Sequence, residues 1–256
     1  MTISTRVVNW IDERTGTKVI QETLLDRLMP SGIGWVYTLG SATLLAFTIQ
    51  AITGIFLAMN YVPTPDHAYD SILYINNEAS FGWLLRGLHR WGASAMVLLV
   101  FLHMIRVFFM GAYKYPREIT WAVGIVLLAV TIGFGFTGYL LPWDQKAYWA
   151  TMVGTNLAGQ APLVGDIVLK ALRGGESLGA MTLNRFFAFH VMLLPAATTV
   201  LLGVHLYLVV RHGISAPPKR IESLMPSDET PEWQPDWQTR WQPETIKSEP
   251  DMEGKL

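Results

Sequence analysis

The sequence predicts an all-α integral membrane protein: a four-helix bundle accompanied by short surface helices. Of its 256 residues, 51% are hydrophobic and only 15% are charged, and the mean hydropathy is +0.30. An average soluble domain has about 25% charged residues, so this balance favours a membrane protein. Four stretches are long and apolar enough to cross a bilayer, and two of them have a histidine near each end.

The composition also excludes several classes of site. The formal net charge of −1 gives no reason to expect nucleic acid as a partner. Because the chain has no cysteine, it cannot itself form disulfides, thiolate zinc sites, iron–sulfur clusters or thioether-linked haem. A metal must therefore be held by histidine, by carboxylate or by a partner subunit. The first 29 residues are repeatedly charged and have no apolar signal region, so we expect the spans themselves to direct insertion.

The two ends of the chain differ from its middle. Residues 1–29 are predicted to be an amphipathic surface segment, because apolar residues recur there at helical spacing (Ile3, Val7, Trp10 and Ile11). This segment either lies on the membrane surface or packs against partner subunits. Residues 216–256 contain seven of the 14 prolines and many acidic residues. Such a tail cannot build a core, and we expect it to be extended, with its tryptophans available to a partner.

Residues 30–215 are predicted to be the membrane domain. Its spans are expected at about 35–60, 83–110, 119–141 and 186–210, each long enough for roughly 30 Å of hydrocarbon. Pro195 lies inside the fourth span and should bend it locally. Between the third and fourth spans, proline, glycine and charged residues exclude another crossing, and short surface helices are expected at 143–155 and 163–172.

The distribution of basic residues predicts the orientation of the spans. An even number of spans places both termini on one side of the membrane. The N-terminal segment, the loop between the second and third spans and the segment after the fourth span are basic: Arg6, Arg14, Lys18, Arg27, Lys114, Arg117, Arg211, Lys219 and Arg220. The loop between the first and second spans has no Lys or Arg. The positive-inside rule therefore predicts that both termini are cytoplasmic.

Four histidines form two predicted pairs. His89 and His103, fourteen residues apart in the second span, lie within about 40° on one helix face and roughly 21 Å apart along it. His190 and His205 occupy the fourth span in the same way. Because both spans run in the same direction, His89 should face His190 at the outer level, and His103 should face His205 at the inner level. Two facing imidazoles suit a six-coordinate haem that carries electrons. The alternative is that each histidine simply bonds to a neighbouring polar group.

Glycines in the other two spans match these levels. Gly40 and Gly54 lie in the first span and Gly124 and Gly138 in the third, again fourteen residues apart. Gly40 and Gly124 fall at the inner level, and Gly54 and Gly138 at the outer level. Glycine lets a backbone approach a flat macrocycle closely, although small residues also serve ordinary helix packing in membranes.

Three arginines lie close to the histidines in sequence. Arg86 precedes His89 by three residues, Arg106 follows His103 by three, and Arg185 lies just ahead of His190. A guanidinium pairs well with a carboxylate, so these residues are candidate partners for haem propionates. The alternative is that they extend to the membrane interface.

Several sequence strings resemble a known family. They are Gln50-x-x-Thr53-Gly54 with Leu57-Ala58-Met59, the stretch that contains His89 and His103, Gly138-Tyr139-Leu140-Leu141-Pro142-Trp143, and Arg185-Phe186-Phe187-Ala188-Phe189-His190. Over about residues 30–215 the chain is similar to the N-terminal, haem-carrying half of cytochrome b from cytochrome bc complexes. The fifteen-residue spacing of His190 and His205, the string Pro142-Trp143-Asp144-Gln145 and the end after four spans resemble the short, split, cytochrome b6-like form.

The resemblance implies a function and partners. It implies two non-covalent b-type haems, with quinol oxidised at the outer face, quinone reduced at the inner face, and a contribution to proton translocation. The candidate quinone-site residues are Tyr139, Pro142, Lys146 and Trp149 outside and, more weakly, Arg211 and His212 inside. Implied partners are a three-span cytochrome b subunit, a Rieske iron–sulfur protein, a cytochrome c-type acceptor, membrane lipid and a second copy of the complex. The subunit would not be active alone, and its membrane would be a bacterial inner membrane or an equivalent one.

Two positions depart from the family pattern. Thr38 stands where cytochrome b6 has a cysteine that attaches an extra haem, so we expect no thioether-linked haem here. Pro231-Glu232-Trp233-Gln234 is similar to a quinol-site motif of the C-terminal half, but it lies in the polar tail and is interpreted as coincidence. Two other functions remain open: a di-haem anchor between a separate dehydrogenase and the quinone pool, and a transporter with structural histidines.

Overall fold

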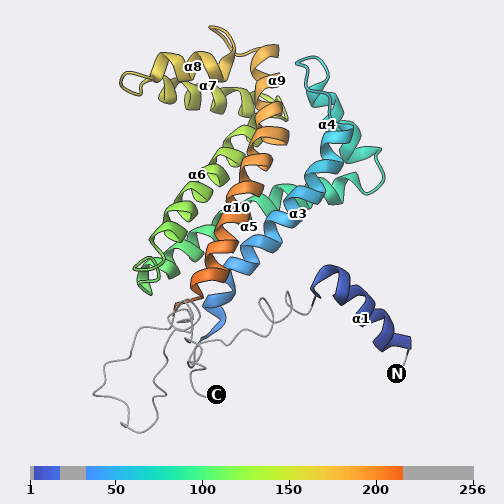
Figure 1. Cartoon of the computed structure of the whole chain (residues 1–256). Helices are drawn as coiled ribbons and strands as arrows, with labels where there is room; N and C mark the ends of the chain where they lie inside the picture. Colours follow the sequence, from blue (N-terminus) through green and yellow to red (C-terminus); the bar gives the residue numbers. More distant parts are fainter. Residues whose placement is uncertain (1–2, 18–32, 216–256) are drawn as a thin grey trace, which may run out of the picture. The chain divides into compact units, whose positions relative to one another are not determined.

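The computed structural model describes residues 3–17 and 33–215, and this part of the chain contains helices but no strand. It divides into two units, one with helix α1 and the chain from Tyr207 onward, the other Gly34–Leu206 with most of the spans (Figure 1). The predicted boundary at residue 29, the tail 216–256 and the basic residues Lys18, Arg27, Lys219 and Arg220 lie outside the described residues.

The four predicted spans are confirmed. The first, Trp35–Asn60, consists of the 3₁₀ turn η1 (Trp35–Thr38) and α3 (Leu39–Asn60), and the second and third are α5 (Gly82–Phe109) and α6 (Glu118–Leu140). The fourth is continuous over Ala180–His212 and contains α9 (Ala180–Ala188), the π turn η2 (Phe189–Leu193) and α10 (Leu194–His212). It begins six residues before the predicted start, because Thr182, Asn184 and Arg185 interrupt the apolar pattern while the helix continues through them.

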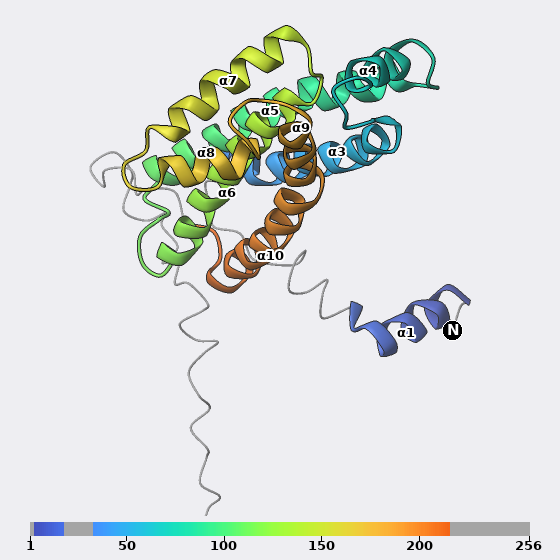
Figure 2. The ribbon, with the colours of Figure 1, turned by 90° about the horizontal axis from the view of Figure 1, so that it is seen from above.

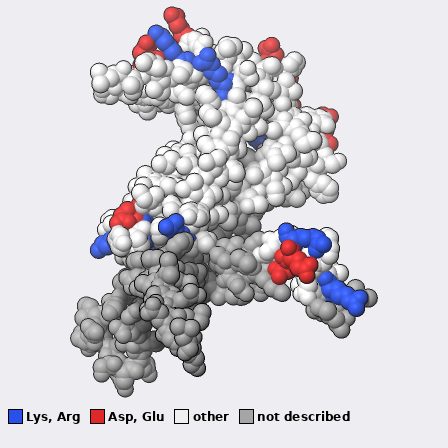
Figure 3. Space-filling model, in the orientation of Figure 1, with Lys and Arg blue, Asp and Glu red and all other residues white. Residues whose placement is uncertain are grey.

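Within Gly34–Leu206 the spans pack against one another in pairs. Helix α3 packs along α5, and α9 with η2 packs against α6 (Figures 1 and 2). Only 6–11% of the most apolar stretch of each span is buried within this chain. The middle of this unit is almost free of charged side chains on the face drawn in Figure 3. An uncharged exterior of this kind is typical of helices that lipid or partner helices cover.

Short helices connect the spans. The two expected between the third and fourth spans are present as α7 (Gln145–Gly159) and α8 (Gly165–Arg173). Asp144 caps α7 by accepting a hydrogen bond from the Ala147 backbone N–H at 2.7 Å. Helix α4 (Ala68–Asn77) was expected to be loop. Its ten residues are too few for apolar periodicity to distinguish it from an irregular connection.

A buried arginine joins α7, α8 and the start of α9. Arg173 is only 5% exposed. Its side chain donates hydrogen bonds to Thr155 Oγ1 at 2.9 Å and to Asn156 Oδ1 at 2.8 Å. It also donates to the Met152 and Glu176 carbonyl oxygens, and its own carbonyl accepts from Thr182 Oγ1 at 2.7 Å. The planar guanidinium therefore fixes three helices through hydrogen bonds alone.

Replacing Arg173 with methionine should destabilise this segment. Methionine has similar length but no donors, and hydrogen bonds from a charged group contribute about 1.5–3 kcal/mol each, so we expect a loss of about 3 kcal/mol. Thermal unfolding and limited proteolysis of residues 145–188 in the purified protein measure it. Lys170→Ala on the same helix is the control, because the ion pair of Lys170 with Asp166 is exposed and its loss should leave the melting temperature unchanged. Equal effects of the two variants would contradict the role of Arg173.

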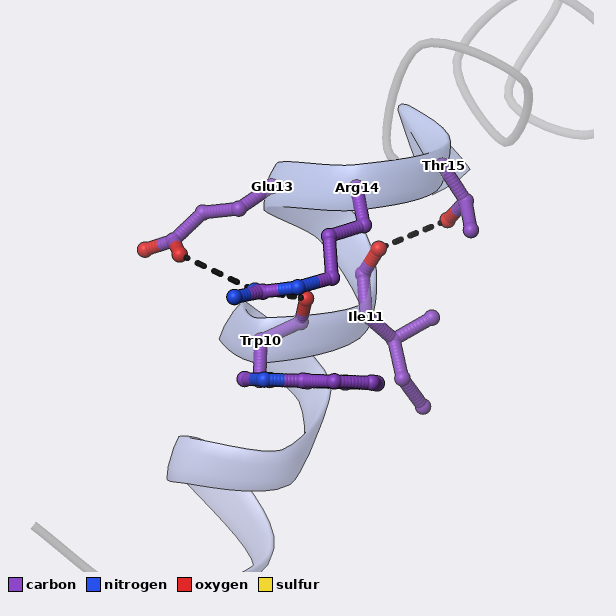
Figure 4. A network of polar contacts seen from close by, with 5 residues as sticks. All are labelled: Trp10, Ile11, Glu13, Arg14 and Thr15. Carbon is purple, nitrogen blue, oxygen red and sulfur yellow. Dashed lines mark hydrogen bonds and ion pairs between the residues drawn. The ribbon is translucent and has the colours of Figure 1, made fainter.

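Helix α1 (Ile3–Thr15) has the expected helical structure near the N-terminus. Its last turn is tied together locally: the Arg14 guanidinium lies 4.3 Å from the centre of the Trp10 ring and donates to the Trp10 carbonyl, and Thr15 donates to the Ile11 carbonyl (Figure 4). Val7, Val8 and Trp10 are more than half exposed. A contact of this apolar surface with the membrane or with a partner stays a prediction.

Candidate metal centres

The outer histidines face each other. His89 lies on α5 and His190 in the π turn η2, and their ring centres are 6.3 Å apart with ring planes at 75°. A metal between two imidazole nitrogens needs bonds of about 2 Å each. The observed separation of the ring centres leaves room for a metal bonded to one nitrogen of each ring.

The hydrogen bonds of the outer pair leave one nitrogen of each ring available. Thr53 Oγ1 lies 3.0 Å from His89 Nδ1, and Thr137 Oγ1 lies 3.0 Å from His190 Nδ1. Each hydroxyl donates its only proton to a backbone carbonyl four residues earlier, Ile49 at 2.6 Å and Gly133 at 2.8 Å. The hydroxyl oxygen must then accept from Nδ1–H. Both rings consequently present an unprotonated Nε2, which is the form that binds a metal.

Thr53 and Thr137 were not identified as functional residues from the sequence. The signal was present, because each immediately precedes one of the two outer glycines, Gly54 and Gly138. The inner glycines, Gly40 and Gly124, follow Leu39 and Val123 instead. Threonine is common in membrane helices, where it bonds to its own backbone, so the dipeptide alone does not indicate a role.

The π turn accounts for the fifteen-residue spacing of His190 and His205. In a regular helix, one residue more than fourteen would rotate the second histidine by about 100°. Within η2 the Leu194 N–H donates to the Phe189 carbonyl, five residues back, so one residue is taken up locally. Pro195, which was expected to bend the span, directly follows this turn.

The inner histidines have fewer hydrogen bonds. His103 on α5 and His205 on α10 lie close enough for electrostatic interaction between their rings. Among the residues that the structure describes, His205 Nδ1 is buried without a hydrogen-bond partner, although the Thr120 carbonyl lies close to the His205 ring. Over the same residues, no hydrogen bond reaches a ring nitrogen of His103.

Each of the four glycines lies beside one of the four histidines. A Cβ atom added to Gly138 would lie 2.6 Å from His190 Cε1, and one on Gly54 would lie 3.2 Å from His89 Cε1. At the inner level, a Cβ on Gly40 would lie 3.2 Å from His103, and one on Gly124 would lie 3.6 Å from His205. A side chain at Gly138, and to a lesser degree at Gly40 or Gly54, would displace the neighbouring imidazole, whereas a Cβ on Gly124 would make only ordinary contact.

The three arginines differ in their contacts. The Arg106 guanidinium lies 3.9 Å from the centre of the Tyr37 ring, and in the described part of the chain its Nε and NH2 are buried without hydrogen-bond partners. Such donors are suited to an anion. Arg86 instead donates to Asn76 Oδ1 at 3.1 Å. Arg185 donates to the Lys170 and Ala171 carbonyls at the end of α8, so one of its nitrogens is already engaged.

The candidate quinone-site residues lie in two places. Tyr139, Pro142, Lys146 and Trp149 cluster where α6 ends and α7 begins, and Tyr139 and Trp149 are 48% and 62% exposed. Nearby, Tyr61 donates to the Leu141 carbonyl, and burial raises the pKa of the Tyr61 phenol, which keeps this donor protonated. Arg211 and His212 lie at the end of α10, where Arg211 donates to Tyr207 Oη at 3.0 Å.

These residues fit a haem better than a free metal ion. Among the described residues, no group of three or more histidine, cysteine or acidic side chains could hold a metal ion. A pair of imidazoles would supply two ligands, and a haem would bring four nitrogens of its own. Four apolar helices that carry one pair of facing imidazoles and a second pair of histidines on the same two spans are typical of membrane-bound b-type cytochromes.

The chain belongs to the cytochrome b/b6 family. The family model described as Cytochrome b/b6/petB matches residues 24–213. Cytochrome b6 of Prochlorococcus marinus (strain MIT 9303) is 42% identical over 217 residues, which cover 85% of this chain and 100% of the relative. Cytochrome b6 of Synechococcus elongatus is 42% identical over 212 residues, which cover 83% of this chain and 99% of the relative.

A solved structure has the same fold. A chain of a hyperthermophilic respiratory Complex III is similar with a TM-score of 0.77 and 35% sequence identity. The match covers 88% of this chain and 59% of that one, so this chain spans about three fifths of its length. Membership of the family makes the protein an electron-transport protein of a membrane, and the family implies b-type haem.

Proposed function

We propose that this chain is the di-haem cytochrome b subunit of a quinol:cytochrome c oxidoreductase, or of one with a similar acceptor. The observation that carries the proposal is the outer pair, His89 and His190. Their ring centres are 6.3 Å apart, and the hydrogen bonds at Nδ1 leave Nε2 of each ring unprotonated. The cytochrome b6 relatives and the similarity to a Complex III chain support the same assignment. Two b-type haems would be bound, one at each pair of histidines. Both would be non-covalent, because Thr38 offers no thiol for a covalent link.

The residues have distinct parts in this function. His89 and His190 would hold the outer haem and His103 and His205 the inner one, while Gly54, Gly138, Gly40 and Gly124 admit the rings. When bound, such groups supply one-electron transfer between two levels of the membrane. Arg106 is positioned to bind a carboxylate at the inner level, whereas Arg86 and Arg185 would have to exchange existing hydrogen bonds to do so.

The quinol chemistry would take place at the two ends of the spans. A quinol oxidised beside Tyr139, Pro142, Lys146 and Trp149 releases two protons and two electrons. One electron would reduce a Rieske protein, and the other would pass from the outer level to the inner level. There, near Arg211 and His212, it would contribute to reduction of a quinone, with proton uptake from the cytoplasmic side. This scheme requires both termini on that side, a three-span partner subunit, a cytochrome c-type acceptor and a dimeric complex.

The test is a haem count on the isolated complex. A reduced-minus-oxidised spectrum and a pyridine haemochrome assay should give two non-covalent b haems per copy of this subunit, and redox titration should resolve two potentials. Co-purification with a Rieske protein and a three-span subunit is expected; their replacement by a dehydrogenase would favour the di-haem anchor. Absence of haem would overturn the proposal and favour a transporter with structural histidines.

A further inference from the structure

The two candidate centres differ in the environment of their histidines. At the outer level, both Nδ1 atoms contact a threonine hydroxyl, and both threonines are buried, with Thr53 3% and Thr137 6% exposed. At the inner level, within the described chain, neither histidine has a hydroxyl partner. The same arrangement thus occurs twice around one centre, from two different spans, and is lacking at the other.

The direction of these hydrogen bonds determines their effect. Thr53 and Thr137 each donate to a backbone carbonyl of their own helix, so their oxygens can only accept from the histidines. When a threonine oxygen accepts a hydrogen bond from Nδ1–H, the imidazole becomes a more basic ligand through Nε2 and its ring orientation is fixed. A more basic ligand stabilises the more highly charged, oxidised metal, and this lowers the reduction potential.

We propose that Thr53 and Thr137 are positioning residues that hold the reduction potential of the outer centre down and fix its two ring planes. The inference rests on the proposed function, since it requires haem between His89 and His190. The backbone carbonyls of Gln50 and Phe134 also lie within reach of His89 and His190, so another acceptor remains when a hydroxyl is removed. Each hydroxyl should therefore have a moderate effect.

The test is a redox titration of the complex with Thr53→Val or Thr137→Val. Valine keeps the shape of threonine and removes the acceptor. Each variant should raise the reduction potential of the outer haem. We expect its reduction equilibrium constant to increase threefold to tenfold, which is a shift of at most about 59 mV for one electron. The inner haem should titrate as in the unmodified complex. Thr53→Ser and Thr137→Ser keep the hydroxyl and should restore the original potential.

Two other threonines provide matched controls. Thr43 on α3 donates to the Leu39 carbonyl and Thr131 on α6 to the Leu127 carbonyl, and in the described residues no hydrogen bond joins either of them to a histidine. Thr43→Val and Thr131→Val should leave both potentials unchanged. If they shift the outer potential as much as Thr53→Val and Thr137→Val, the effect is structural and the proposal is wrong.

The remaining outcomes separate the two proposals. Two haems with an unchanged outer potential in both valine variants would overturn this inference and leave the proposed function intact. An equal shift of both haems, or serine variants that behave like valine, would overturn it as well. Loss of the outer haem in the valine variants with retention in the serine variants would support the positioning role. Lack of haem in the unmodified complex would instead contradict the proposed function.

Discussion

Replacing His190 with leucine should remove the outer haem and leave the inner haem in place. Leucine cannot ligate a metal, and His89 alone would hold the haem less firmly than the pair of imidazoles. The inner ligands lie on the same two spans, roughly 20 Å away along each helix. The pyridine haemochrome assay should therefore fall from two haems per subunit to one, and only one potential should remain in the redox titration.

Two further substitutions sharpen this experiment. His205→Leu should give the mirror result, with the outer haem retained and the inner one lost. His67→Leu is the control, because His67 is an exposed residue just before α4, and both haems should remain. Loss of both haems in His190→Leu, or of neither, would contradict the pairing of His89 with His190 and of His103 with His205.

Alanine at Gly138 should be nearly as damaging as loss of the ligand itself. Its Cβ would lie 2.6 Å from His190 Cε1, a separation that forces the imidazole away from His89. Overpacking of this kind costs about 1–3 kcal/mol, and here the displaced group is a metal ligand. We expect Gly138→Ala to lose most of the outer haem, as measured by haem content and the reduced-minus-oxidised spectrum.

The four glycines should form a graded series. Gly40→Ala and Gly54→Ala, with added Cβ atoms 3.2 Å from an imidazole, should weaken haem binding less than Gly138→Ala. Gly124→Ala, at 3.6 Å, is in ordinary contact distance and should keep its haem. Gly135→Ala on the same helix as Gly138 is the control, since nothing lies within 4 Å of its added Cβ. Haem loss in Gly135→Ala equal to that in Gly138→Ala would rule out the steric explanation.

The positions of the spans and the relation of glycines to histidines could be predicted from the sequence, because both follow from regular periodicity. Hydropathy locates the first three spans within one residue at each end. The rise of about 1.5 Å per residue predicts that Gly54 lies at the level of His89. The start of α9 could not be located in this way, since its first turns are polar and are held by packing against α6 and α8.

The finer contacts could not be predicted, because they depend on which neighbours three-dimensional packing provides. Arg185 was a candidate for binding a propionate, but the structure places it on the carbonyls at the end of α8, a contact that no spacing encodes. The contacts of Thr53 and Thr137 with the histidines arise only once the helices are placed together. The π turn was likewise not predicted, although the fifteen-residue spacing of His190 and His205 is the sequence feature that results from it.

The π turn at Phe189–Leu193 has an evolutionary consequence. A one-residue insertion in a membrane helix ordinarily rotates everything beyond it by about 100°, so selection should remove it. Here a single wide turn confines the extra residue beside His190, and the remainder of the helix keeps its register. A spacing of fifteen can therefore present the second imidazole as a spacing of fourteen does in a regular helix, so one added codon beside His190 need not destroy the site.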